Sequence, residues 1–245
     1  MNEEYPKLAI IGYGSMGHEI EHLARENKFI ITDIIDVDNR LSPDKKYQFD
    51  VAIDFSLPSV VVNNIETLID LGKSVVVGTT GWYNDLDFVE QMVSNAGTGL
   101  IYGANFSLGV QIFMKLIKQA AKLANKTEDY DIMVSEIHHK RKKDSPSGTA
   151  LSISEIILDE LNSKNAILAE TIHTQIPPNV LHVTSTRGGE VPGTHIVYLE
   201  SLSDSIELVH RAKNRTGFAS GALMAARWIH GRKGVYKFQD IFDNL

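Results

Sequence analysis

The segment EIHHKRKKDSPSGTAL, from Glu136 to Leu151, carries two histidines followed directly by four cations. A histidine can exchange a proton near neutral pH, and a lysine or arginine can hold an anion. The segment follows an expected strand over 131–137 and precedes an expected helix over 149–161, whose first N–H groups also attract an anion. These residues together predict a binding site for a small anion that carries one or two carboxylates.

The start of the expected helix supplies the main-chain part of this site. Either Ser147 or Asp144 can cap the helix, because both side chains can accept a hydrogen bond from its first turn. The N–H groups of Gly148 and Thr149 then point out of that turn, and the glycine lets a ligand come close to the main chain. We therefore expect a ligand to lie in front of these N–H groups.

The two histidines and the basic residues are expected to differ in role. His138 and His139 are neighbours on an extended chain, so they point in different directions, and at most one of them performs proton chemistry. Two of the four residues in 140–143 are expected to be solvated, since a loop that faces a ligand on one side faces water on the other. A zinc site is disfavoured because the segment has no HxxxH spacing and the chain has no cysteine, so no metal is expected.

A second group of residues with chemical meaning lies near the start of the chain. Gly12, Gly14 and Gly17 fit the pattern GxGxxG, between an apolar run over 8–11 and a segment with helical spacing. In this pattern the glycines allow a tight turn, the close approach of a pyrophosphate, and packing of the helix on the strand. The order strand, glycine turn and helix therefore predicts a dinucleotide site.

An acidic residue at the end of the next expected strand supports this prediction. The strand covers 29–35 and ends at Asp36, nineteen residues after Gly17. An acid about 20 residues after the glycines binds the ribose hydroxyls of the adenosine half of the cofactor. Asp38, one strand period further along, is the competing candidate.

Apolar runs and helical segments continue to alternate after this point. Expected strands cover 51–56, 74–81 and 99–110, and expected helices cover 60–71 and 85–95. Valine and isoleucine runs that alternate with helices predict an α/β fold, a Rossmann-type doubly wound parallel sheet covered on both faces. Ligands of such sheets bind beyond the carboxyl ends of the strands. The residues expected there are Phe55, Gly78, Thr79, Thr80, Asn105 and Phe106.

The pattern changes near residue 110. A helix is expected over 110–125, and segments of alternating polar and apolar residues then favour antiparallel strands. These segments are 131–139, 181–187, 195–201 and 204–212. A last helix is expected over 217–231. We therefore predict a dinucleotide-binding domain over 1–109 and 217–245. The remainder, 110–216, is predicted to be a separate α+β domain that carries the anion site and has a mostly antiparallel sheet.

The overall composition limits the partners and the location. The chain has 24 Lys and Arg against 31 Asp and Glu, a formal net charge of −7, which argues against broad binding to nucleic acid or to a membrane surface. The absence of cysteine excludes disulfides and thiolate catalysis. The first apolar run is too short for a signal peptide, and no segment approaches the ~18 apolar residues of a membrane span. A soluble cytoplasmic protein is the expectation.

Seven segments, in order along nearly the whole chain, resemble the dihydrodipicolinate reductase (4-hydroxy-tetrahydrodipicolinate reductase) family of bacterial lysine biosynthesis. They are GYGSMG, DFS, GTTG, ANFSLGV, EIHHKRKKDSPSGTAL, STRGGEVPGTH and HRAKNRTGFASGAL. The pattern E-x-H-H-x-x-K-x-D-x-P-S-G-T is the most specific of these. The resemblance implies an enzyme that uses NADH or NADPH to reduce a cyclic dicarboxylate imine in diaminopimelate and lysine biosynthesis. It also implies that 110–216 is a substrate-binding and oligomerisation (tetramerisation) domain, with a homotetramer built through its sheet.

The resemblance implies roles for individual residues. His138 is implied as a proton donor or acceptor, and Lys142 as a second proton donor and a substrate anchor. The implied substrate-binding residues are His139, Ser147, Gly148 and Thr149. The cofactor-binding residues, implied by the resemblance together with the glycine pattern and the strand ends, are Gly12, Tyr13, Gly14, Ser15, Met16, Gly17, Asp36, Phe55, Gly78, Thr79, Thr80, Gly103, Ala104, Asn105 and Phe106.

One departure from the family bears on the cofactor. Many members carry an arginine where this chain has Ser15, and Asp36 would repel a 2′-phosphate, so we predict a preference for NADH over NADPH unless Arg40 or Lys45 compensates. Two other functions stay open. Another nicotinamide-dependent reductase of a small dicarboxylate would not need the His-His-x-x-Lys segment, and a non-catalytic NADH-binding sensor would usually carry an added recognition module.

Overall fold

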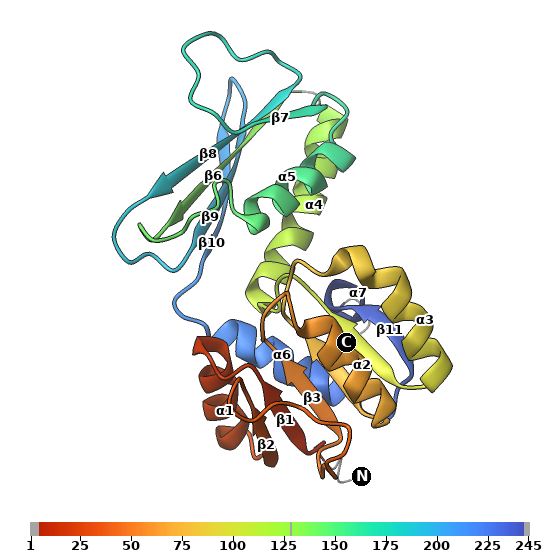
Figure 1. Ribbon diagram of the computed structural model, residues 1–245. Helices are drawn as coiled ribbons and strands as arrows, with labels where there is room; N and C mark the ends of the chain where they lie inside the picture. The colour runs from red at the N-terminus through yellow and green to blue at the C-terminus, as the bar shows by residue number, and fades with distance from the viewer. Residues whose placement is uncertain (1–4, 128, 243–245) are drawn as a thin grey trace. The chain divides into compact units, whose positions relative to one another are not determined.

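A computed structural model describes residues 5–127 and 129–242 of the chain. The chain forms two compact units, which we call the first unit (1–108 with 215–245) and the second unit (109–214). The borders predicted from the sequence lie within two residues of these bounds. Figure 1 shows the elements of each unit.

The first unit is built on a six-stranded parallel sheet with the strand order β11-β5-β4-β3-β1-β2. Its strands are β1 (Leu8–Ile11), β2 (Ile31–Ile35), β3 (Val51–Asp54), β4 (Ser74–Val77), β5 (Gly99–Tyr102) and β11 (Gly234–Lys237). Because β1 pairs with β2 on one side and β3 on the other, the strand order reverses direction at β1 and β3. In doubly wound sheets this is where a ligand binds.

Helices cover both faces of this sheet, which confirms the doubly wound prediction. Alternate residues of β1 enter two separate cores, Leu8 and Ile10 on one face and Ala9 and Ile11 on the other. The helices are α1 (Ser15–Glu26) and α6 (Thr216–Ile229) on the first face, and α2 (Val61–Asp70) and α3 (Leu86–Ala96) on the second, as Figure 1 allows the reader to follow. Burial on both faces explains why the central strands β1, β3, β4 and β5 are apolar almost throughout.

The second unit has a five-stranded sheet with the order β10-β9-β6-β8-β7. Its strands are β6 (Asp131–His138), β7 (Ala166–Leu168), β8 (Val180–Arg187), β9 (Thr194–Glu200) and β10 (Ser205–Arg211). Two helices, α4 (Leu108–Thr127) and α5 (Gly148–Glu160), pack on one face and form a third core with it. The other face accounts for the alternation of polar and apolar residues in the strands.

The second sheet is mixed rather than mostly antiparallel. β9 pairs antiparallel with β6 and β10, whereas β8 pairs parallel with β6 and β7. Alternating polarity reports that one face is exposed and says nothing about strand direction. The expected helix between β6 and the later strands was the missed signal, because a helical crossover returns the chain parallel to its starting strand.

Three short elements were not predicted from the sequence. They are β7, β11 and the helix α7 (Phe238–Phe242); a short 3₁₀ turn, η1 (Tyr83–Asp85), also precedes α3. Elements of three to five residues contain too little periodicity to be recognised, and β11 is placed by its pairing with β5. Among the helices of the described residues, none has both the length and the apolar character that a membrane crossing requires.

Candidate active site

The three glycines after β1 meet three different constraints in the first unit. Gly12 has a φ of 85°, and a Cβ there would lie 2.5 Å from the carbonyl oxygen of Phe55. A Cβ on Gly17 would collide with the carbonyl oxygen of Gly12. A Cβ on Gly14, by contrast, would meet nothing within 4 Å. The first and third glycines are thus required by packing, and the second leaves open the space that an approaching pyrophosphate needs.

The helix that follows this turn can support an anion at its start. Gly14 occupies the N-cap of α1, a helix of 12 residues, and offers no side chain to its first N–H groups. Ser15 is exposed, Met16 is half-buried against the core, and the Tyr13 ring stacks on His18 with a centroid separation of 3.9 Å. The main chain of this turn therefore fits the pyrophosphate of a dinucleotide.

The ends of β3 and β4 are joined by a buried carboxylate that sequence reasoning did not assign to the site. Asp54 accepts hydrogen bonds from the main-chain N–H and the hydroxyl of Ser56, at 2.8 and 2.6 Å. It also accepts from Asn64 at 2.8 Å and from the hydroxyl of Thr79 at 3.2 Å. Burial raises the pKa of Asp54, and these hydrogen bonds oppose that shift. Asp54 therefore fixes the two strand ends that were predicted to face the cofactor.

The remaining predicted cofactor residues follow the carboxyl ends of their strands, with one difference. The Phe55 ring lies across Gly78, where any Cβ would overlap it. Asp36 is exposed directly after β2. Phe106 is 1% exposed and packs on Phe238 at a centroid distance of 4.5 Å, so its ring belongs to the core and only its main chain could meet a ligand. The others, Thr80, Gly103, Ala104 and Asn105, lie partly or fully at the surface.

In the second unit a polar row crosses the otherwise apolar, helix-covered face of the sheet. Strand register places Ser185, Glu136, His195 and His210 side by side on four neighbouring strands. The next row of side chains on this face, which contains Val134, Val183 and Val197, is apolar and belongs to the core. The row marks where the core ends and a functional site can begin, at the carboxyl end of β6.

Glu136 is the centre of this row and is fully buried. Its Oε1 accepts hydrogen bonds from Arg187 at 2.7 Å, from the Ser185 hydroxyl at 2.8 Å and from the Ser147 N–H at 3.0 Å. Burial raises the pKa of Glu136, but the His195 ring, whose Nε2 lies 3.5 Å from Oε2, and the donors Ser147, Arg187 and Ser185 outweigh it and hold the pKa well below its usual range. Glu136 is therefore a permanent buried anion, neutralised by Arg187.

His138 lies beside this anion and is 7% exposed. Its Nδ1 is 3.4 Å from Oε2 of Glu136, and its ring is 5.1 Å from that of His195. Burial lowers the pKa of His138 to about 4; Glu136 opposes this shift, while His195, Lys142 and Arg187 add to it. Residue type alone predicts a pKa near neutrality for a histidine. His138 is instead a neutral imidazole at pH 7 in the unliganded protein, because burial outweighs its acidic neighbour.

Lys142 is held by a neighbour within its own loop. Its Nζ lies 2.8 Å from the carboxylate of Asp144, and the main-chain oxygen of Asp144 accepts a hydrogen bond from Arg187 at 2.7 Å. The Lys142 ammonium lowers the pKa of Asp144 through this hydrogen bond. Arg141, in contrast, forms an exposed pair with Glu190, and Lys143 is exposed. The basic segment thus divides into residues turned toward the polar row and residues in solvent.

The start of α5 completes the site. Ser147 rather than Asp144 is the N-cap, since its hydroxyl accepts a hydrogen bond from the Ala150 N–H at 3.1 Å. Gly148 is exposed, and a Cβ there would meet nothing within 4 Å. Thr149 and His139 are half-buried. The open main chain at Gly148 is a place where a carboxylate could accept hydrogen bonds from the helix N-terminus.

Three residues of this arrangement were absent from the sequence-based assignment. They are Glu136, Arg187 and His195, and all three lie within quoted family segments, which was the only available signal. Their side chains could be connected only through strand register, because β8 and β9 bring them to β6 from distant parts of the chain. Ligand atoms of Glu136, His138 and His195 lie within 4.8 Å of one another and could hold a metal ion. Arg187 already neutralises the carboxylate, so the absence of a metal stays our prediction.

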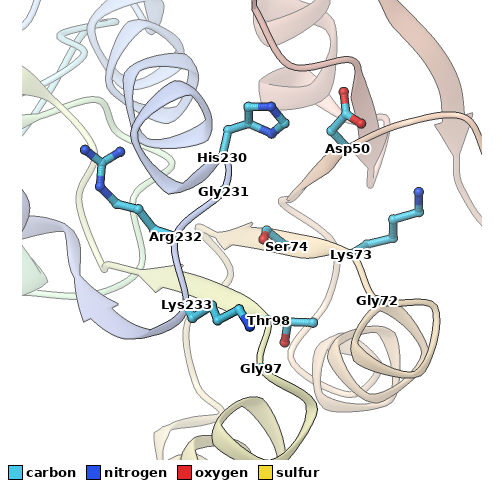
Figure 2. Close-up of a pocket in the computed structure, with 10 residues that line it drawn as sticks. All are labelled: Asp50, Gly72, Lys73, Ser74, Gly97, Thr98, His230, Gly231, Arg232 and Lys233. Atoms are coloured by element: carbon cyan, nitrogen blue, oxygen red, sulfur yellow. The ribbon is translucent and has the colours of Figure 1, made fainter.

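A hollow of about 280 Å³ lies at the opposite, amino-terminal edge of the first sheet (Figure 2). Helices α2, α3 and α6 end beside it, so the negative ends of their dipoles face it. Two of its cations already bind the chain itself: Lys73 donates to the Phe49 carbonyl at 2.6 Å, and Arg232 donates to the Trp228 carbonyl and stacks on its ring. This hollow is explained by helix ends and is not the predicted site.

Comparison with known proteins agrees with both halves of this description. The family model described as "Dihydrodipicolinate reductase, N-terminus" matches residues 6–106, and the model described as "Dihydrodipicolinate reductase, C-terminus" matches residues 109–242. A curated 4-hydroxy-tetrahydrodipicolinate reductase from Christiangramia forsetii is 38% identical over 241 residues, covering 97% of this chain and 98% of that protein. One from Pseudomonas fluorescens strain SBW25 is 38% identical over 203 residues, covering 80% of this chain and 74% of that protein.

A solved structure has the same fold. It is a dipicolinate-bound dihydrodipicolinate reductase from Paenisporosarcina sp. TG-14, with a TM-score of 0.77 and 22% identity. The match covers 97% of this chain and 100% of that one. At 22% identity this similarity supports the fold alone. The family models and the curated relatives are evidence about the family as well.

Proposed function

This chain belongs to the dihydrodipicolinate reductase family, and from that premise we propose that it reduces 4-hydroxy-tetrahydrodipicolinate to tetrahydrodipicolinate with a reduced nicotinamide cofactor, in diaminopimelate and lysine biosynthesis. The observation that carries the proposal is the site at the carboxyl end of β6. There the second unit brings together Lys142, His138 and the open start of α5, the parts required to hold and protonate a small dicarboxylate.

The charge balance of the second unit supports a dicarboxylate substrate. Glu136 and Arg187 neutralise each other, and His138 is neutral at pH 7. Lys142 is a cation that can serve a ligand, because its present partner Asp144 is exposed and can be exchanged for a substrate carboxylate. A second carboxylate can bind the N–H groups at Gly148 and Thr149, with His139 beside them. The similar reductase from Paenisporosarcina was solved with a dicarboxylate bound.

The chain's own residues divide the proton chemistry between them. When bound, the nicotinamide would supply a hydride to an electron-poor carbon of the substrate, and with one proton taken up the 4-hydroxyl group leaves as water. The negative charge that develops there is best received by the Lys142 ammonium, which is the charged donor near neutral pH. Neutral His138 acts first as an acceptor, and becomes a donor only if a bound dianion raises its pKa. We therefore assign Lys142 as the proton donor and substrate anchor. His138 is assigned as the second group that takes part in proton transfer.

The first unit supports a dinucleotide, with NADH preferred. Gly12, Gly14 and Gly17 fit the turn and the open main chain that a pyrophosphate needs. Ser15 places no positive charge at the start of α1, and the exposed Asp36 suits a ribose hydroxyl better than a 2′-phosphate. Lys45 donates a hydrogen bond to Asn39 at 3.1 Å, which reduces its ability to bind a 2′-phosphate.

The expected cytoplasmic location stays part of this proposal.

A homotetramer formed through the second sheet is also part of the proposal. The face of that sheet opposite α4 and α5 carries partly or largely exposed apolar side chains, among them Met133, Ile196 and Tyr198. A sheet face of this kind is suited to burial against a copy of itself. Light scattering should give the mass of four chains for the wild type, and Ile196→Asp should lower it. A monomeric wild type would contradict this part.

The decisive experiment follows the absorbance of the reduced nicotinamide when the purified chain meets freshly generated 4-hydroxy-tetrahydrodipicolinate. Rapid substrate-dependent oxidation is the expected result, and NADH and NADPH measured in parallel give the cofactor preference. Cofactor binding without any turnover would instead favour the sensor function. Turnover only with other small dicarboxylates would point to a different reductase on the same architecture.

A further inference from the structure

A continuous set of polar contacts joins the two residues to which proton chemistry is assigned. Nδ1 of His138 lies 3.4 Å from Oε2 of Glu136, whose Oε1 accepts a hydrogen bond from Nη2 of Arg187 at 2.7 Å. The same Nη2 donates to the main-chain oxygen of Asp144 at 2.7 Å, and the Asp144 carboxylate holds Lys142 at 2.8 Å. One buried acid and one arginine thus connect His138 to Lys142.

We infer that Glu136 and Arg187 are positioning residues for the reaction: Glu136 fixes which nitrogen of His138 carries the proton, and Arg187 holds the loop that presents Lys142. Both act through another residue rather than on the substrate. The kinetic consequence of this inference rests on the proposed reductase function. Its structural consequence, the tautomer of His138, can be measured without substrate or cofactor.

The groups that face the two ring nitrogens determine the tautomer of His138. Nδ1 of His138 faces Oε2 of Glu136, which Nε2 of His195 also approaches to 3.5 Å, but neither Nδ1 nor Oε2 makes a regular hydrogen bond to any described residue. An unprotonated Nδ1 would place two lone pairs opposite each other in a buried site, which is costly. The proton of the neutral ring therefore belongs on Nδ1. Nε2 lies beside Gly193, where a Cβ would approach it to 3.1 Å. This nitrogen keeps its lone pair and is the acceptor.

The loop between β6 and α5 is fastened at two points by the same pair. Arg187 holds the main chain of Asp144, and Glu136 accepts the N–H of Ser147 at 3.0 Å. Lys142 lies on the loop just before these attachment points. Loss of either member of the pair leaves the other charge buried without a partner, and frees one attachment of the loop. A displacement of about 1 Å at a catalytic group can cost ~10²-fold in rate.

A purely structural role for the pair would make a different prediction. A buried ion pair that served only stability would lower the melting temperature when removed, and would leave the tautomer and the kinetics of the folded fraction unchanged. The chain contains a matched control in the exposed pair Arg141–Glu190, whose two hydrogen bonds of 2.7 and 2.6 Å connect the same loop to the segment after β8. Both residues are exposed, and no catalytic or binding role is assigned to either of them.

The first test is the tautomer, measured by ¹⁵N NMR of histidine-labelled protein at about pH 7.5, with His138→Gln used to assign the signal. We expect Nδ1 of His138 to carry the proton. In Glu136→Gln, the donors Arg187, Ser147 and Ser185 keep the amide oxygen where Oε1 was, so the amide NH₂ faces the ring and moves the proton to Nε2. Glu190→Gln should leave the signal unchanged. A wild-type ring protonated on Nε2, or a tautomer indifferent to Glu136→Gln, would overturn the inference.

The second test is kinetic. Arg187→Met should lower kcat/KM for the dicarboxylate by at least ~10²-fold, while the cofactor dissociation constant, measured by fluorescence, stays within about twofold. Arg187→Lys, which keeps the charge, should recover at least ~10-fold of that loss and decides the matter if the methionine variant does not fold. Substrate kinetics for Arg187→Met that match those of Arg141→Met would sink the positioning role. Absence of turnover in the wild type would instead count against the proposed function, and the tautomer would still be decided by NMR.

Discussion

The candidate sites of the two units are built from different chemical groups, main chain in one and side chains in the other. In the first unit the ligand space is shaped by the main chain at Gly12, Gly14 and Gly17. It is also shaped by the ends of β3 and β4, which hydrogen bonds to Asp54 hold together. In the second unit it is shaped by the side chains of the polar row and its loop, centred on the buried Glu136. The first site is a matter of steric room, whereas the second is a matter of balanced charge.

This difference determines how each site can fail. A substitution at a glycine changes room or backbone conformation, and its effect stays with the turn that contains it. A substitution in the polar row leaves a partner charge unpaired, and the effect spreads to every group that shared it. The first site is therefore expected to lose ligand affinity in steps, and the second to lose several functions together.

The largest expected effect comes from the second site. Lys142→Ala removes the charged donor and the substrate anchor at once, so kcat/KM for the dicarboxylate should fall by at least ~10²-fold. Lys143→Ala, which removes an exposed neighbouring cation, is the control and should stay near wild type. Steady-state kinetics at saturating cofactor provide the measurement. Wild-type kinetics for Lys142→Ala would place Lys142 among the solvated residues of its segment.

A pair of glycine variants tests the steric account of the first site. Gly14→Ala should leave the melting temperature unchanged, because its Cβ meets nothing, yet weaken cofactor binding about tenfold by occupying the approach of the pyrophosphate. Gly12→Ala should instead destabilise the unit by at least ~1 kcal/mol, since its φ is positive and the Phe55 carbonyl is in the way. Titration calorimetry and thermal melts separate the two outcomes. Unchanged affinity in Gly14→Ala would remove the ligand from this turn.

The two sites also differ in how much the sequence could predict. The turn at Gly12 is a local pattern, so spacing alone predicted the strand, the glycines and the helix. The doubly wound sheet followed from runs that are apolar because both faces are buried. The direction of the Phe106 ring could not be predicted, because a residue at a strand end can face the core as readily as a ligand. No local pattern distinguishes the two directions.

The second site depends on partners that the sequence does not place together. Glu136 is joined to Arg187 across 51 residues, and the register that pairs them exists only once β8 lies parallel to β6. The pKa of His138 shows the same limit, since its shift comes from burial and from charges on other strands. Residue types predict proton chemistry as a possibility, but the direction of proton transfer depends on the tertiary surroundings.

A smaller effect is expected from a charge added to the first site. Ser15→Arg places a cation at the start of α1, where it can reach a 2′-phosphate, and should improve kcat/KM for NADPH roughly fivefold, as expected for ~1 kcal/mol from one exposed charge contact. The value for NADH should change little. Asp36→Asn is the companion variant, because it removes repulsion without adding a cation. A wild type that already prefers NADPH would show that the cofactor preference does not follow from these two positions.

The smallest expected effect is a change in acid stability, and it reports on the second site alone. The pKa of His138 is lowered to about 4 from an ordinary value of 6.5. At a pH between these two values, the residue is therefore protonated in the unfolded chain and neutral in the folded chain. Stability from this residue is therefore present above pH 6.5 and is lost as the pH falls toward 4. The groups that face the ring are Glu136, His195, Lys142 and Arg187, and they remain in His138→Gln. Between about pH 7.5 and 5 the wild type should lose roughly 3–5 °C more in melting temperature than this variant. Parallel melting curves would show that His138 takes up its proton equally in the folded and unfolded chain, and that burial in the polar row does not keep it neutral.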